Sequence, residues 1–253
     1  MSEKELHVCA CITESYFPLY HRLFNKTLPT EFNSITLHHA RNHNSQPGCV
    51  GEKNFKHINY QKLHFVRQQL SAHRGENLLV LDLDIVFFRD FKKQINTLLE
   101  QHDMIFQRNN TPLSPLCIGV WGLQCSDKNI NFFDKEVLPR AEALLKTAEE
   151  WEELHRTKTP VPNAWFAWRE GKQTYYDGDQ CVINAAALTP LGQDLKIHIL
   201  PDTYANEESG GPAPHECVLY HGTGAQGQES KAHHLYETYY KIKEKIEKAT
   251  GEK

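Results

Sequence analysis

The sequence predicts an α/β sandwich in which helices cover both faces of a mostly parallel central sheet. Residues 78–83 (LLVLDL) form a near-continuous apolar run, which is typical of a strand that is covered on both faces. Segments with strand character alternate with segments of helical periodicity in the first half of the chain. The chain has 253 residues, of which 40% are hydrophobic and 24% charged, as expected for a folded globular protein.

In the first half of the chain, we expect three strands and two helices. The strands are predicted at residues 7–12, 34–39 and 78–83, and the helices at residues 15–28 and 59–73. The second helix has the clearer pattern, because Tyr60, Leu63, Val66 and Leu70 recur at steps of three or four residues and form one apolar face.

The second half is predicted to be more mixed. We expect strands at residues 104–107, 118–123, 196–200 and 217–220, helices at 133–156 and 179–188, a loop at 206–214 and a C-terminal amphipathic helix at about 231–249. A helical and aromatic insert is predicted at about 130–176. Because the sequence contains no repeat and no low-complexity linker, we expect one domain spanning residues 1–253.

Charge and composition exclude several classes of protein. The formal net charge is −4, so there is no overall positive field to attract nucleic acid, and we expect no nucleic-acid partner. The seven cysteines include no C-x-x-C pair, which favours reduced thiols. We find no secretion signal and no apolar run long enough for a transmembrane segment. A cytoplasmic location is therefore expected.

Asp82 and Asp84 are the most informative residues for function. On a strand, residues two positions apart point to the same face, so both carboxylates are expected side by side at the end of an apolar strand. Two such charges repel one another and lose hydration unless a cation compensates them. Oxygen ligands favour Mg²⁺ or Mn²⁺. The plainer interpretation is a strand end with two solvated aspartates.

Two enzyme classes place an aspartate pair after such a strand. A haloacid-dehalogenase-like phosphatase would use Asp82 as a nucleophile with Mg²⁺, but its late acidic motif would need a carboxylate where Ile183 stands. A nucleotide-sugar glycosyltransferase would use the Asp-x-Asp to bind a metal. The segment from Asp179 to Asn184 favours the second class, because it is similar to the Asp-Gln-x-x-x-Asn signature of glycogenin-like enzymes and of lipopolysaccharide galactosyltransferase-like enzymes.

A third segment carries a histidine into a glycine-containing loop. The run CVLYH is predicted to be a strand that ends at His221, and Gly222 and Gly224 would let the backbone approach a ligand closely. A neutral imidazole can be a third ligand of Mn²⁺, and Lys231 further along can neutralise a phosphate.

Together, these motifs resemble the nucleotide-diphospho-sugar transferases, which are GT-A (Rossmann-like) enzymes that mostly retain the anomeric configuration. The resemblance covers roughly residues 6–231, nearly the whole chain, and rests on the order of the motifs. Lys231 departs from the glycogenin-like pattern, in which the lysine follows the glycine closely, because it lies seven residues after Gly224.

The resemblance implies roles for the donor-binding residues. Asp82 would contact the ribose and the metal, while Asp84 and His221 would hold Mn²⁺ (or Mg²⁺) against the diphosphate. The nucleotide-binding residues would be Thr13, Tyr16, Lys62, Asp82, Gly222, Gly224 and Lys231.

The resemblance also implies the chemistry. Asp179 would bind the hydroxyls of the donor sugar, and Gln180 would lie near the anomeric carbon. The expected reaction is transfer of a hexose or pentose from a nucleotide-sugar, with a UDP-sugar as the donor, to a hydroxyl of a glycan, a protein or a lipid-linked acceptor. A catalytically silent nucleotide-sugar-binding module remains an alternative, as does the phosphatase.

Aromatic residues suggest an acceptor site. Three of the four tryptophans lie between residues 151 and 168, and aromatic faces stack on sugars. Trp165 and Trp168 are therefore candidates for acceptor binding. Ordinary packing of an aromatic insert explains the same pattern.

Overall fold

The computed structural model describes residues 4–32, 35–40, 53–109, 114–145, 166–169, 172–175, 178–206, 216–222 and 228–251. No helix in these ranges is both long and apolar enough to cross a membrane. None of the six cysteines that these ranges contain forms a disulfide.

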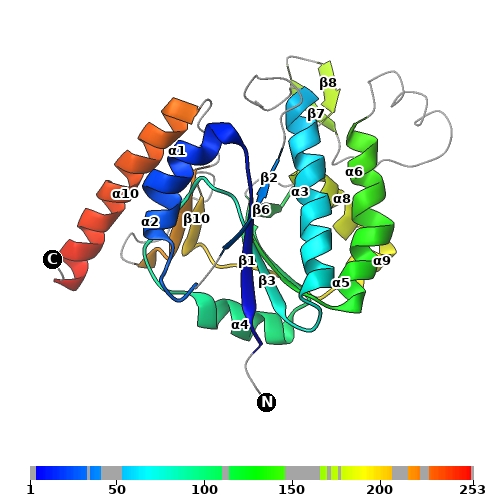
Figure 1. Cartoon of the computed structure of the whole chain (residues 1–253), viewed down its shortest axis with the longest axis horizontal. Helices are drawn as coiled ribbons and strands as arrows, with labels where there is room; N and C mark the ends of the chain where they lie inside the picture. Colours follow the sequence, from blue (N-terminus) through cyan, green and yellow to red (C-terminus); the bar gives the residue numbers. More distant parts are fainter. Residues whose placement is uncertain are drawn as a thin grey trace.

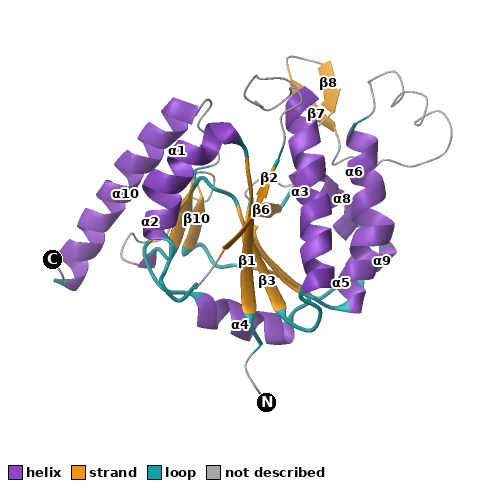
Figure 2. Cartoon of the chain, in the orientation of Figure 1, coloured by secondary structure: helices purple, strands orange, loops and turns teal. Residues whose placement is uncertain are grey.

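The centre of the molecule is a six-stranded sheet (Figures 1 and 2). Its strands, in spatial order, are β2 (Ile35–His39), β1 (Leu6–Ile12), β3 (Asn77–Leu81), β6 (Leu116–Gln124), β5 (Met104–Arg108) and β9 (Ile197–Ile199). Within this sheet, β6 runs antiparallel to both of its neighbours, and the other pairs are parallel. The predicted mostly parallel sheet is therefore confirmed.

β3 is covered on both of its faces, as its apolar run predicts. Leu78 and Val80 belong to the core on one side of the sheet, and Leu79 and Leu81 belong to the core on the other side. All four side chains are at most 1% exposed. This alternation follows from the two-residue period of a strand.

Helices form a layer on each side of the sheet (Figure 1). One layer contains α3 (Lys53–Ala72), α5 (Asp127–Phe132), the π-helical turn Phe133–Val137, α6 (Leu138–Leu144), α8 (Asp179–Ala187) and α9 (Pro190–Gln193). The other contains α4 (Lys92–Gln101) and a helical segment in four turns, Glu14–Tyr16, α1 (Phe17–Leu19), Tyr20–Phe24 and α2 (Asn25–Thr27).

A smaller sheet extends the second layer. It consists of β10 (Tyr204–Asn206), β11 (Leu219–His221) and β4 (Ile85–Phe87), in that order. The C-terminal helix α10 (Gln228–Thr250) packs on this region through Leu235, which contacts a cluster containing Leu19, Leu23 and Val86. A separate hairpin joins β7 (Phe166–Arg169) and β8 (Lys172–Tyr175).

The structure corrects several predicted elements. The strand expected at 78–83 ends at Leu81, because the chain leaves the main sheet at Asp82 and enters the small sheet as β4. Helix α4 was not expected, since its segment KKQINTLLEQ is largely polar and buries only one narrow face. The hairpin β7–β8 lies inside the predicted helical insert, and residues 146–165 of that insert lie outside the described residues.

The topology brings several chain segments to one edge of the sheet. The parallel strands β1, β2, β3 and β5 all end at this edge, and the antiparallel β6 begins there. In open α/β sheets, ligands bind beyond the carboxyl ends of the strands. Asp82 follows β3 at this edge.

The two-sided burial of β3 gives a stability prediction. Leu79→Ala, in the middle of the strand and 0% exposed, should lower the free energy of unfolding by about 2–5 kcal/mol, because it leaves a cavity in the core. The matched control is Leu188→Ala, whose side chain is 58% exposed and which should cost no more than about 0.5 kcal/mol. Urea unfolding of both variants measures the difference, and equal losses would contradict it.

Candidate functional site

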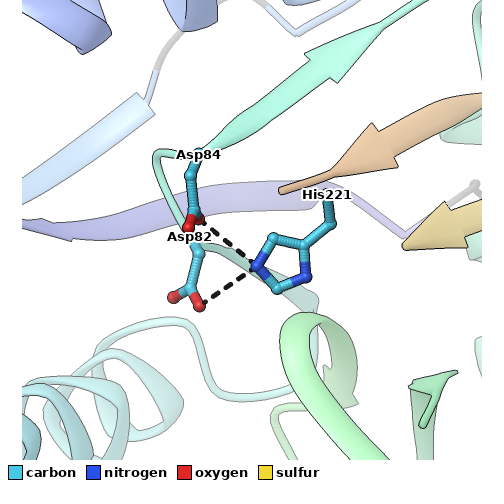
Figure 3. A group of neighbouring side chains, drawn as sticks. All are labelled: Asp82, Asp84 and His221. Carbon is cyan, nitrogen blue, oxygen red and sulfur yellow. Dashed lines mark ion pairs between the residues drawn. The ribbon is translucent and has the colours of Figure 1, made fainter. Parts of the chain in front are cut away.

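Asp82, Asp84 and His221 meet at the carboxyl edge of β3 (Figure 3). Asp82 follows β3, Asp84 precedes β4, and His221 is the last residue of β11, which pairs with β4. His221 Nε2 lies 3.3 Å from Asp84 Oδ1 and 3.8 Å from Asp82 Oδ2. The three side chains can offer ligand atoms that all lie within 4.8 Å of one another.

Asp84 is buried between two cationic partners. Its carboxylate contacts His221 on one side and Lys231 Nζ on the other, at 2.5 Å. Burial opposes ionisation of Asp84, but Lys231 and His221 outweigh it and hold the pKa of Asp84 well below its usual range. In the same way, Asp84 overcomes burial and raises the pKa of His221 to about 10. Asp84 is therefore ionised at neutral pH.

Lys62 joins Asp82 to a third carboxylate. Its Nζ lies 2.6 Å from Asp82 Oδ1 and 3.0 Å from Asp179 Oδ2. Burial opposes the charge of Lys62, but Asp179 and Asp82 raise its pKa above the usual value. Burial also raises the pKa of Asp179, although Lys62 counteracts this. The two carboxylates share one lysine that reaches them from the buried face of α3.

The amino-terminal end of α8 is anchored at the same edge. Asp179 is its first residue, and its Oδ1 accepts a hydrogen bond from the backbone N–H of Gln180, 3.0 Å away. Asn184, further along the helix, makes two hydrogen bonds to the backbone of Leu116. Its side-chain Nδ2 donates to the Leu116 carbonyl oxygen at 2.8 Å, and its Oδ1 accepts from the Leu116 N–H at 3.0 Å. The Asp-Gln-x-x-x-Asn pattern therefore combines two site residues with one that fastens the helix to β6.

Two predicted nucleotide-binding residues follow β1. Thr13 is buried at the end of the strand, and its hydroxyl lies 2.9 Å from that of Ser15. The ring of Tyr16 lies 6.0 Å from Lys231 Nζ, and burial and the Asp84 carboxylate raise its pKa. Tyr16 thus borders the charged cluster.

Lys231 reaches the site although it lies far from the glycines in sequence. Helix α10 places it against Asp84, 147 positions earlier in the chain. Gly222 makes this possible, because a Cβ at this position would come within 2.9 Å of the Leu235 side chain of α10. The backbone N–H of Gly222 also donates to the backbone carbonyl oxygen of Asp84, at 2.9 Å.

Sequence reasoning missed the residues that support this site. Gln107 and Cys117 contact His221 from β5 and β6, and Ser114 lies 3.3 Å from the Gln180 amide nitrogen. The one available signal was a polar glutamine in the apolar run MIFQ.

Three predicted residues cannot be placed at the site. Gly224 and Trp165 lie outside the described residues. Trp168 lies on β7, but its side chain is not described. The acceptor-binding role of the two tryptophans stays a prediction.

The cluster of Asp82, Asp84 and His221 fits a divalent cation. Two carboxylates and one imidazole provide the hard oxygen and borderline nitrogen ligands that suit Mn²⁺ or Mg²⁺. Asp82 is the most accessible of the three, with its side chain 33% exposed, whereas Asp84 and His221 are 8% and 4% exposed. Asp84 and His221 are thus enclosed by the protein, whereas Asp82 is partly accessible to solvent.

The fold is shared with solved glycosyltransferases. A glycosyltransferase involved in glycosylation of the major capsid of PBCV-1 is 10% identical, with a TM-score of 0.51, over 92% of this chain and 98% of that chain. The apo structure of the bifunctional glycosyltransferase WbbM is 9% identical, with a TM-score of 0.51, over 93% of this chain and 52% of that chain. No curated protein sequence matches the chain.

The family model for nucleotide-diphospho-sugar transferases matches residues 30–235. The match includes Asp82, Asp84, Asp179, His221 and Lys231, which the structure brings together. It gives no support to the phosphatase alternative. The chain belongs to the nucleotide-diphospho-sugar transferase family and is a glycosyltransferase that uses nucleotide-sugar donors.

Proposed function

We propose that the protein transfers a sugar from a UDP-sugar to a hydroxyl acceptor, with a divalent metal and with retention of the anomeric configuration. The observation that supports this most is the joint position of the Asp82, Asp84 and His221 cluster beside Lys231 and Asp179. One part of the site can hold the diphosphate, and the neighbouring part can hold the sugar.

Asp84 and His221 would hold Mn²⁺ (or Mg²⁺), and the more exposed Asp82 would complete the set of ligands. When bound, the metal supplies positive charge that stabilises the diphosphate leaving group. The two carboxylates and the imidazole, and the burial of Asp84 and His221, support this assignment.

Lys231 would neutralise the leaving diphosphate. Its ammonium group contacts Asp84. Burial opposes the charge of Lys231, but Asp84 outweighs burial and raises its pKa above the usual value, so Lys231 stays charged at neutral pH. Negative charge grows on the diphosphate as the sugar–phosphate bond breaks. A cation fixed in advance near that charge stabilises the transition state more than the ground state.

Asp179 would bind hydroxyls of the donor sugar, with Gln180 close to the anomeric carbon. Lys62 holds Asp179 and Asp82 in one arrangement, which would couple the position of the sugar to that of the ribose. Gln180 is a poor nucleophile, which favours a same-face reaction in which a leaving phosphate oxygen takes the proton of the acceptor hydroxyl.

Thr13 and Tyr16 would contact the nucleotide base from the end of β1. We also propose a cytoplasmic location, which is supported by the absence of disulfides among the six described cysteines.

Metal-dependent nucleotide binding tests the donor site. Calorimetry with UDP, GDP and CDP should give tight binding of UDP with Mn²⁺ present and little binding after EDTA treatment. Asp84→Asn should abolish the metal-dependent part, because it removes one buried ligand charge.

The matched control is Asp127→Asn, which makes the same change at a side chain that is 80% exposed on α5. It should leave UDP affinity unchanged. Full UDP affinity in Asp84→Asn would contradict the proposed site, and tighter binding of GDP or CDP would contradict the proposed base.

A variant of Asp179 separates sugar transfer from nucleotide binding. Asp179→Asn should lower kcat/KM for the UDP-sugar by about 10- to 100-fold, because it weakens charged hydrogen bonds to the sugar. UDP affinity should stay within about threefold of the wild type. UDP release from a panel of UDP-sugars measures turnover. A wild-type protein that binds UDP but never releases it from any UDP-sugar would favour the silent binding module.

A further inference from the structure

The imidazole of His221 contacts a buried glutamine on the side that faces away from the two carboxylates. His221 Nδ1, the ring nitrogen that faces away from Asp82 and Asp84, lies 3.0 Å from Oε1 of Gln107. Gln107 is 0% exposed and His221 is 4% exposed, so neither group can exchange this contact for water. The hydrogen bond therefore occupies one ring nitrogen and leaves Nε2 facing the two carboxylates.

The orientation of the Gln107 amide is determined by its other contacts. Its Nε2 donates to two backbone carbonyls of β10, those of Tyr204 at 3.0 Å and Ala205 at 2.9 Å. A carbonyl oxygen can only accept, so the amide nitrogen must point to β10 and Oε1 must point to His221. The thiol of Cys117 also donates to Oε1, at 3.4 Å. With its oxygen turned to the ring, Gln107 can only accept a hydrogen bond, so Nδ1 must be the donor.

An irregularity of the main sheet places Gln107 and clears space for the ring. Phe106 pairs with Trp121, but the next residue of β5, Gln107, pairs with Cys117, so residues 118–120 of β6 have no partner on β5. Bulges of this kind redirect side chains next to functional sites. Gly119 lies in this stretch, and a Cβ there would come within 1.9 Å of His221 Cε1. The ring can lie in this position only over a glycine.

We propose that Gln107 is a positioning residue for the metal site: when a cation displaces the proton of His221 Nε2, the amide oxygen of Gln107 keeps the other proton on Nδ1 and so directs the Nε2 lone pair to the cation held with Asp82 and Asp84. This inference rests on the proposed metal-dependent function. Partners that fix the tautomer of a metal-binding histidine are worth about 10- to 100-fold in metal affinity.

A purely structural role for Gln107 makes a different prediction. Its two bonds to β10 join the main sheet to the small sheet, so their loss would lower stability whether or not His221 is present. A residue that acts through His221 should affect metal affinity in the wild-type background but not in a variant that lacks the His221 imidazole. A double-mutant cycle separates these two cases.

The experiment measures the Mn²⁺ dissociation constant from the electron paramagnetic resonance signal of free Mn²⁺, with UDP and without it. The four proteins are the wild type, Gln107→Met, His221→Ala and the double variant. Methionine matches the length of glutamine but has no amide oxygen. We expect Gln107→Met to weaken Mn²⁺ binding about 10- to 100-fold in the wild-type background and less than about twofold in the His221→Ala background. An unchanged affinity, or equal losses in both backgrounds, would overturn the inference.

A conservative variant serves as the matched control. Gln107→Glu keeps an oxygen acceptor for Nδ1 but loses the two donors to β10, so its Mn²⁺ affinity should stay within about threefold of the wild type while its thermal stability falls. If Gln107→Glu loses Mn²⁺ affinity as Gln107→Met does, the amide oxygen is not the group that matters, and the inference fails.

A measurement on the native protein covers the case in which Gln107→Met does not fold. In the Mg²⁺-loaded protein with ¹⁵N-labelled histidine, His221 should carry its proton on Nδ1 and none on Nε2, with its signal assigned by its loss in His221→Ala. The reverse tautomer would overturn the inference. A wild-type protein that takes up neither Mn²⁺ nor Mg²⁺ would overturn the proposed metal site and this inference together, whereas normal metal uptake with the reverse tautomer would overturn this inference alone.

Discussion

The structure depends on the compensation of two carboxylates at the end of one buried strand. Asp84 is almost fully buried, and an isolated charge there would cost several kcal/mol. Lys231 and His221 contact it from two other elements, and Lys62 contacts Asp82 from a third. The charge pattern therefore requires α3, β11 and α10 to meet at the carboxyl edge of β3. In the proposed function, the metal cofactor would bind the carboxylates of this network and the diphosphate of the nucleotide-sugar would lie beside Lys231.

The main sheet and the small sheet together place the charged side chains of the site. The chain leaves the main sheet at Asp82, and β4 then pairs with β11, so the backbone that carries Asp84 is tied directly to the backbone that carries His221. The backbone N–H of Gly222 donates to the backbone carbonyl oxygen of Asp84 across the same junction. Asp82 and Asp84 lie in the three-residue connection between β3 and β4, whose two ends are held by strand pairing, and His221 is the last residue of β11. Regular elements on either side of a short connection hold its side chains more accurately than a long loop would. Gln107 and Gly119 reach the imidazole from β5 and β6 of the main sheet.

Much of the fold and part of the site could be predicted from sequence. The apolar run at 78–83 predicted a doubly covered strand, and its four core residues divide between the two faces as a strand requires. Strand alternation predicted the parallel sheet, but not that β6 would be antiparallel, since direction depends on pairing between distant segments. Helix α4 escaped prediction because a largely polar segment gives a weak periodic signal. Lys231 could be suggested by resemblance alone, since its distance from Gly224 follows no short motif.

The sequence by itself determined the α/β class, the aspartate pair and the acid at the start of α8, because each depends on local periodicity or on a short spacing. Only the tertiary structure decided which basic side chain pairs with which carboxylate. Lys62 could have paired with one aspartate or with two, and the structure places it between Asp82 and Asp179. The tertiary structure also decided that Gln107, a single polar residue in an apolar strand, faces His221, which lies 114 positions later. Burial makes such contacts necessary, since a buried polar group must find a partner, but only the folded chain determines which partner is within reach.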